Sequence, residues 1–165
     1  MSDTPEHLVE RLLHEGQRTL EFFRLLNPEQ WGKIIYAEGT AWEVGDLLAH
    51  FVSAEAGITR LVENILAGGQ GAPEDFDLNA YNERKVAGLK QATHQDLFLE
   101  FAKLRDKSAA LVRGLDQNDL EMVGRHPWLG MTTIGEMIKM MYRHNQIHQR
   151  DIRRALESGE RSEDG

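Results

Sequence analysis

The chain has 165 residues, of which 41% are hydrophobic, and this is enough to bury one substantial core. Its formal net charge of −8 disfavours a general nucleic-acid-binding function, because a phosphate backbone would be repelled at long range. The absence of cysteine excludes disulfides, thiolate metal ligands and a cysteine nucleophile, so any metal site must use nitrogen and oxygen ligands.

These properties predict one domain over residues 1–157, followed by a polar, frayed tail over residues 158–165. The first six residues are polar and acidic, with no apolar segment behind them, and no uncharged apolar run approaches membrane-spanning length. We therefore expect a cytoplasmic protein that binds neither membranes nor nucleic acids.

The first predicted helix covers residues 5–26, with Thr4 as its N-cap. The second covers residues 40–66. Thr40 and Glu43 match the capping-box pattern, in which a hydroxyl and a carboxylate each accept a hydrogen bond from the other's backbone N–H group. A glycine-rich segment after this helix marks its end.

A shorter helix is predicted over residues 78–91, a long helix over residues 93–113 and a final long helix over residues 133–156. Thr133 and Glu136 match a second capping box. No segment shows persuasive strand-like alternation. The pattern predicts an all-α fold, namely a four-helix bundle with a crossover connection and one short extra helix.

Three of the seven histidines form the most informative pattern in the chain. His144 and His148 are four residues apart on the last predicted helix, so their side chains diverge by only ~40° with ~6 Å of rise and can reach one ion. His148 is in phase with the apolar residues of that helix, and His50 lies at the edge of the apolar face of the second helix. Together, the three histidines are candidate ligands of a facial metal site.

A simpler interpretation is that each of these histidines is a core or boundary residue with a hydrogen-bond partner. A spacing of four residues also arises readily by chance among seven histidines. If one of the three ligands fails, His126 is the most suitable replacement. We interpret the remaining histidines as boundary or surface residues: His7, His14 and His94.

Two segments carry a family resemblance. Residues 40–50 (TAWEVGDLLAH) resemble the first metal motif of the DinB/YfiT-like superfamily, in which a tryptophan precedes a helix that carries the first ligand histidine. Residues 131–138 (MTTIGEMI), followed by His144 and His148, resemble the C-terminal motif of that superfamily, with two ligand histidines on the last helix. The resemblance implies a DinB-like bundle with a metal ion bound by His50, His144 and His148.

Three neutral imidazoles leave at least one coordination position of a divalent ion open for water or substrate. Zinc and nickel are the expected metals. The resembled superfamily includes bacillithiol S-transferases and mycothiol-dependent maleylpyruvate isomerases. The resemblance therefore implies metal-dependent thiol S-transferase or hydrolase chemistry on a small molecule, with a low-molecular-weight thiol as a candidate cosubstrate.

Helical phase suggests further site residues, none of them specific to one reaction. Tyr142, Asn145 and Glu55 are candidate acid, base or substrate-contacting groups. Asp46 and Asp151 are candidate partners for the second ring nitrogen of a ligand histidine. For each aspartate there is an alternative interpretation: Asp46 as part of a solvated first helical turn, and Asp151 as the ion-pair partner of an arginine.

A second class of function is a non-enzymatic helical module, in which the metal is structural or absent. We expect a homodimer in either case. Apolar residues that suit a partner surface, or alternatively packing within the chain, are Phe22, Trp31 and Ile35.

Overall fold

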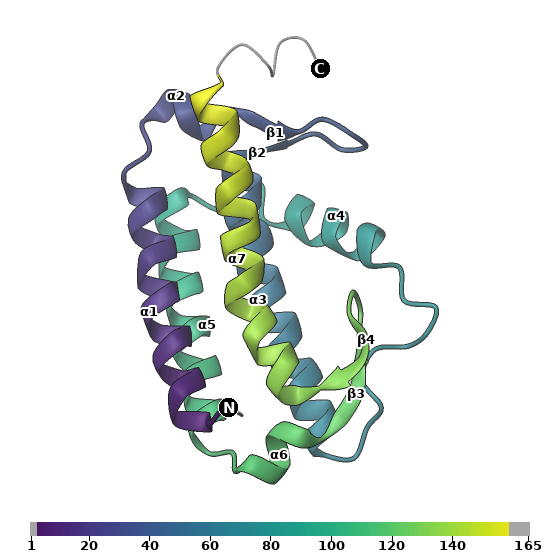
Figure 1. Ribbon diagram of the computed structural model, residues 1–165. Coiled ribbons are helices and arrows are strands. Elements are labelled where there is room, and N and C mark those ends of the chain that lie inside the picture. Colours follow the sequence, from purple (N-terminus) through teal and green to yellow (C-terminus); the bar gives the residue numbers. More distant parts are fainter. Residues whose placement is uncertain (1–2, 159–165) are drawn as a thin grey trace.

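The computed structural model describes residues 3–158, and four long helices dominate it (Figure 1). They are α1 (Pro5–Arg24), α3 (Val44–Leu66), α5 (His94–Arg113) and α7 (Ile134–Glu157). The shorter helices are α2 (Pro28–Trp31), α4 (Leu78–Gly88) and α6 (Gln117–Glu121). Two antiparallel hairpins complete the described residues: β1 (Ile34–Tyr36) with β2 (Trp42–Glu43), and β3 (Val123–His126) with β4 (Gly130–Thr133).

The four long helices form a bundle in which α1 packs against α5 and α7, and α3 packs against the same two helices. Helices α1 and α7 run in one direction and α3 and α5 in the other (Figure 1). The segment that contains α4 returns the chain from the end of α3 to the start of α5, and it is the predicted crossover. The fold prediction is thus confirmed, with α4 as the extra helix and α2 and α6 in addition.

Most of the predicted helix starts are confirmed. The side chains of Thr4, Thr93 and Thr133 each accept a hydrogen bond from a backbone N–H group in the first turn of α1, α5 and α7. At α7 the box is incomplete, because the carboxylate of Glu136 pairs with Lys139 at 2.6 Å. Ser158 is the C-cap of α7, and the rest of the predicted tail lies outside the described residues.

The predicted start of the second helix is wrong by four residues. Helix α3 begins at Val44, and Glu43 and Asp46 form its capping box. Residues 42–43 pair instead with β1, and the backbone N–H of Val44 donates to the carbonyl of Lys33 at 3.0 Å. The expectation of no strands is also wrong. The strands were missed because they have only two to four residues, which is too short to display alternation in the sequence.

Phe22, Trp31 and Ile35 are used for packing within the chain. All three contact the apolar cluster at the upper end of the bundle. The Trp31 ring stacks between Phe23, at 5.5 Å between ring centroids, and His94, at 3.9 Å. The homodimer stays a prediction. Among residues 3–158, no helix combines the length and the apolar character needed to cross a bilayer.

The bundle interior has two apolar clusters separated by a layer of buried polar side chains. One cluster includes Leu12 and Ile138, and the other includes Phe51 and Phe101. Each long helix contributes polar residues to the layer between them: Glu15, Thr19, Glu55, Thr59, Arg105, Ser108, Asn145 and Gln149. Because buried polar groups require partners, this layer fixes how the helices face one another.

Arg105 is the centre of the polar layer. Its Nε and Nη2 atoms donate to the two carboxylate oxygens of Glu55 at 2.8 and 3.0 Å. Nη2 also donates to the side-chain oxygen of Asn145 at 2.7 Å, and Nη1 donates to the carbonyl of Leu12 at 3.0 Å. Ser108 donates to Glu55 at 2.8 Å. Arg105 therefore links all four long helices.

We expect Arg105→Met to lower the free energy of unfolding by about 3–5 kcal/mol, because it leaves the charge of Glu55 buried without its partner. Chemical denaturation provides the measurement. The matched control is Lys107→Met, which removes an exposed cation from the same helix and should cost less than about 1 kcal/mol. Equal effects of the two substitutions would contradict a role for the buried pair.

Candidate metal centre

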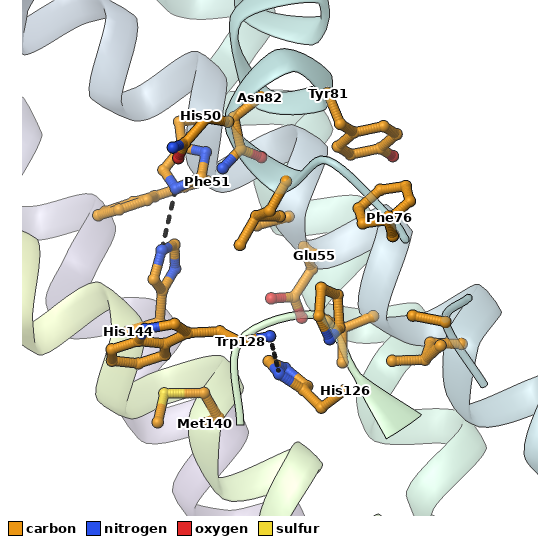
Figure 2. A pocket seen from close by; sticks show the side chains of 18 of the residues that line it. His50, Phe51, Glu55, Phe76, Tyr81, Asn82, His126, Trp128, Met140 and His144 are labelled. Carbon is orange, nitrogen blue, oxygen red and sulfur yellow. Dashed lines mark hydrogen bonds between the residues drawn. The ribbon is translucent and has the colours of Figure 1, made fainter. Parts of the chain in front are cut away.

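The three predicted ligand histidines converge in the structure. His50 lies on α3, and His144 and His148 lie one turn apart on α7. Figure 2 shows His50 and His144 pointing toward each other. The Nε2 atom of His144 lies 2.9 Å from Nε2 of His50 and 3.0 Å from Nε2 of His148. Within the described part of the chain, these residues form the group of histidine or acidic side chains whose ligand atoms are close enough to share an ion.

The spacing of the three nitrogens fits a metal ion. Zn–N bonds of ~2.0–2.1 Å place two ligand nitrogens about 2.9 Å apart at a right angle and about 3.3 Å apart at the tetrahedral angle. The two separations around Nε2 of His144, 2.9 and 3.0 Å, match the right-angle value, and the three ligand nitrogens all lie within 4.8 Å of one another. Three imidazole nitrogens are a donor set that zinc, nickel, iron and copper accept.

The electrostatic environment keeps these rings neutral. Burial, together with the proximity of His148, lowers the pKa of His50 to about 3. Burial, with a contribution from the neighbouring histidines, holds the pKa of His144 well below its ordinary value. Burial also lowers the pKa of His148, although the charge of Asp151 acts in the opposite direction. Neutral imidazoles are the form that binds metal.

Tyr36, in β1, sets the proton position on His148. The Tyr36 hydroxyl donates to the carboxylate of Asp151 and lies 2.8 Å from Nδ1 of His148. Because an ionised carboxylate only accepts, the Tyr36 oxygen must accept a hydrogen bond from the Nδ1–H group of His148. Nε2 of His148 then carries a lone pair directed at the other two histidines. Burial and the hydrogen bond to Asp151 raise the pKa of Tyr36, so its hydroxyl stays protonated.

The two aspartates have different roles from those expected. Asp151 acts on His148 through Tyr36 and not by direct contact. The interpretation of Asp46 as a ring partner is wrong: its carboxylate accepts from the backbone N–H of Glu43 and pairs with Lys90 at 2.6 Å. Asp46 does lie in the first turn of α3, but the expected solvation is wrong, since the residue is only 7% exposed. Sequence reasoning missed Tyr36, since a three-residue strand gives no periodic signal.

The three histidines line a cavity of about 920 Å³ between α3, α4, α7 and the β3–β4 hairpin (Figure 2). Aromatic and aliphatic side chains form much of its wall, including Phe76, Tyr81, Trp128 and Met140. His144 and His148 are partly exposed, whereas His50 is buried. The arrangement leaves the cavity side of the three-nitrogen cluster available to a small molecule.

The acid, base or substrate candidates differ in position. Glu55 and Asn145 line the cavity, whereas Tyr142 is packed in the apolar core with Arg11 over its ring at 4.9 Å. The oxygens of Glu55 are already bound by Arg105 and a serine. Asn145 accepts from Arg105 through its side-chain oxygen, so its NH₂ group is the part free to act.

His126 lines the cavity but does not join the cluster. Its Nδ1 atom accepts hydrogen bonds from the backbone N–H groups of Trp128 and Leu129, each at 3.1 Å. A neutral imidazole with an accepting Nδ1 carries its proton on Nε2, which leaves neither nitrogen ready to bind a metal. This tautomer argues against His126 as a replacement ligand.

A model of the DinB superfamily matches residues 11–152 of the sequence. The chain belongs to the DinB superfamily. The predicted membership of the DinB/YfiT-like superfamily is therefore confirmed. A comparison with curated proteins gives no match.

Solved structures share the fold of this DinB-superfamily chain. YfiT from Bacillus subtilis, "a probable metal-dependent hydrolase with an unusual four-helix bundle topology", has a TM-score of 0.76 and 16% identity, over 94% of this chain and 87% of that one. The colibactin self-resistance protein ClbS, solved with a double-stranded DNA, has a TM-score of 0.70 and 14% identity, over 95% and 98%. The mycothiol-dependent maleylpyruvate isomerase has a TM-score of 0.67 and 15% identity, over 87% of this chain and 60% of that one.

We expect the metal-free protein to lose stability as the pH falls from about 6.5 towards 3. The pKa of His50 is about 3 in the folded protein against an ordinary value of 6.5, so the unfolded chain binds the proton more readily in this interval. The contribution is fully present above about pH 6.5. Chemical denaturation at a series of pH values measures it.

The matched variant is His50→Leu, whose unfolding free energy should depend less steeply on pH over the same interval. Identical slopes for the two proteins would contradict the assignment of His50 as a buried neutral ring.

Proposed function

We propose that this member of the DinB superfamily binds one divalent metal ion through His50, His144 and His148, and uses it in transferase or hydrolase chemistry on a small molecule. The observation that carries the proposal is the convergence of three neutral Nε2 atoms, at 2.9 and 3.0 Å, on the wall of a cavity of about 920 Å³. A structural zinc site normally has four protein ligands, whereas three ligands and an open position are typical of catalytic sites.

Zinc or nickel is the proposed metal. A bound ion of this kind lowers the pKa of a coordinated water or thiol towards neutrality, and so supplies a nucleophile that the side chains alone do not provide. A low-molecular-weight thiol is the proposed cosubstrate. The names of two fold neighbours support this chemistry, since one is called a probable metal-dependent hydrolase and the other a mycothiol-dependent isomerase.

The protein's own residues have three tasks in this proposal. Tyr36 and Asp151 hold the proton of His148 on Nδ1, so that its Nε2 lone pair is always available. The aromatic and aliphatic wall excludes water from one side of the substrate. Arg105 binds the side-chain oxygen of Asn145, which lines the cavity, and the NH₂ group of Asn145 is the proposed hydrogen-bond donor to the substrate.

The proposed setting is the cytoplasm, with the protein as a homodimer that does not bind nucleic acid. The net charge of −8 supports the last point, because it repels a phosphate backbone. The double-stranded DNA in the ClbS structure concerns DNA binding by ClbS, and it is not evidence of DNA binding by this chain.

Metal analysis of the purified protein tests the first half of the proposal. We expect close to one zinc or nickel ion per chain, and at least a tenfold weaker metal affinity in His148→Ala, because two nitrogen ligands hold an ion much less tightly than three. The matched control is His14→Ala, which removes an exposed histidine of α1 and should leave the metal content unchanged. Absence of metal from the wild type, or equal contents in the two variants, would refute the site.

The same preparations distinguish an enzyme from a non-enzymatic module. Removal of the metal by a chelator should lower the melting temperature and abolish turnover of electrophilic or ester test substrates in the presence of a thiol. Loss of stability without any metal-dependent turnover would instead support a module with a structural ion.

Tyr36→Phe tests the proton-holding role of the hydroxyl. Removing it leaves Nδ1 of His148 and the carboxylate of Asp151 without their common partner, so we expect metal affinity to fall by about 10–100-fold. Competition with a chromophoric chelator measures the affinity. Tyr81→Phe is the control, since Tyr81 lines the cavity away from the histidines. An unchanged affinity in Tyr36→Phe would show that the hydroxyl is dispensable.

A further inference from the structure

His126 has a buried ring nitrogen without a hydrogen-bond partner among residues 3–158. The residue is only 6% exposed, and its Nε2 atom has no hydrogen-bond partner among the described residues. A buried N–H group without an acceptor costs about 1–3 kcal/mol, so its retention calls for an explanation.

The position of the proton on this ring is determined by the β3–β4 hairpin. The backbone N–H groups of Trp128 and Leu129 both donate to Nδ1, which must therefore be unprotonated. Burial lowers the pKa of His126 to about 4, so the ring stays neutral at physiological pH. Nε2, on the other side of the ring from the hairpin turn, consequently carries the proton and acts as a donor only.

The ring that carries this buried donor lies in the wall of the cavity that the histidine cluster lines. His126 lines that cavity together with His144, and Figure 2 shows both rings around the same space. The walls near them are apolar or aromatic, including Trp128 and Met140, with Phe76 and Tyr81 farther along. A ligand that fills this space needs an apolar body and an acceptor atom for one neutral N–H group.

We infer that His126 is a substrate-positioning residue, and that the cavity accepts small aromatic or alkyl carbonyl compounds whose oxygen accepts a hydrogen bond from Nε2 of His126. The inference rests on the proposed function in one respect, namely that this cavity holds the substrate. It does not require a bound ion, because the donor and the walls belong to the chain itself.

The test uses chelator-treated, ¹⁵N-labelled protein, so that no metal can hold the carbonyl oxygen. Two-bond ¹H–¹⁵N spectra of the imidazole rings should show His126 protonated on Nε2 and not on Nδ1 between pH 5 and 8. Acetophenone and ethylbenzene, which have the same aromatic body and differ in the carbonyl oxygen, are then titrated separately. We expect both to bind, and acetophenone to shift the Nε2–H resonance of His126.

The decisive variant is His126→Asn, because an asparagine side-chain oxygen can replace Nδ1 as the acceptor for the hairpin amides while the Nε2 donor is lost. It should weaken acetophenone binding about five- to tenfold and change ethylbenzene binding by less than about twofold. His94→Asn is the control, since His94 stacks on Trp31 outside the cavity, and it should alter neither affinity.

Three results would overturn the inference: a proton on Nδ1 of His126 in the wild type, failure of both compounds to bind, or an equal loss of affinity for the two compounds in His126→Asn. The tautomer spectrum remains interpretable if the variant does not fold. Failure of these tests leaves the metal analysis unaffected, and failure of the metal analysis leaves these tests unaffected, so the two proposals can be distinguished.

Discussion

The close approach of three neutral imidazole rings, from α3 and α7, is the constraint on which the rest of the proposed site depends. The Tyr36 hydroxyl leaves Nε2 of His148 as a lone pair, and Nε2 of His144 lies within 3.0 Å of it and of His50. If Nε2 of His144 is protonated, its N–H group can donate a linear hydrogen bond to only one of the two neighbouring rings. If it is unprotonated, its lone pair faces the lone pair of His148. In the proposed site a metal ion would accept all three lone pairs at once, and it requires the neutral form of each ring.

The polar layer below the histidines fixes the relative positions of the two helices that carry them. Arg105 binds Glu55 of α3 and Asn145 of α7, and these two helices carry the histidines. Asn145 directly follows His144 in the chain, so the buried guanidinium fixes α7 next to a ligand. Gly16 of α1 makes room for it, because a Cβ atom there would lie 2.9 Å from Cγ of Arg105. The stability of the bundle and the placement of the three histidines therefore depend on a common network.

Local patterns in the sequence predicted the helices and the three histidines that converge, whereas contacts between residues far apart in the chain were not predicted. The spacing of His144 and His148 is a property of one helix and is readable without a structure. Tyr36 is 112 residues from His148, and no local rule connects them. Similarly, the residues near Arg105 in the sequence do not indicate that its side chain is buried. At Thr40 two local rules competed, and pairing of residues 42–43 with β1 prevailed over the predicted cap because α3 has a second box at Glu43 and Asp46.

The central claim is that His50, His144 and His148 hold one divalent ion with a face open to the cavity. The most direct measurement is a crystal structure with anomalous data collected on both sides of the zinc and nickel absorption edges. We expect one anomalous peak about 2.0–2.1 Å from the three Nε2 atoms, with at least one further ligand on the cavity side. A well-ordered triad without an anomalous peak in metal-supplemented crystals, or an ion enclosed by a fourth protein ligand, would contradict it.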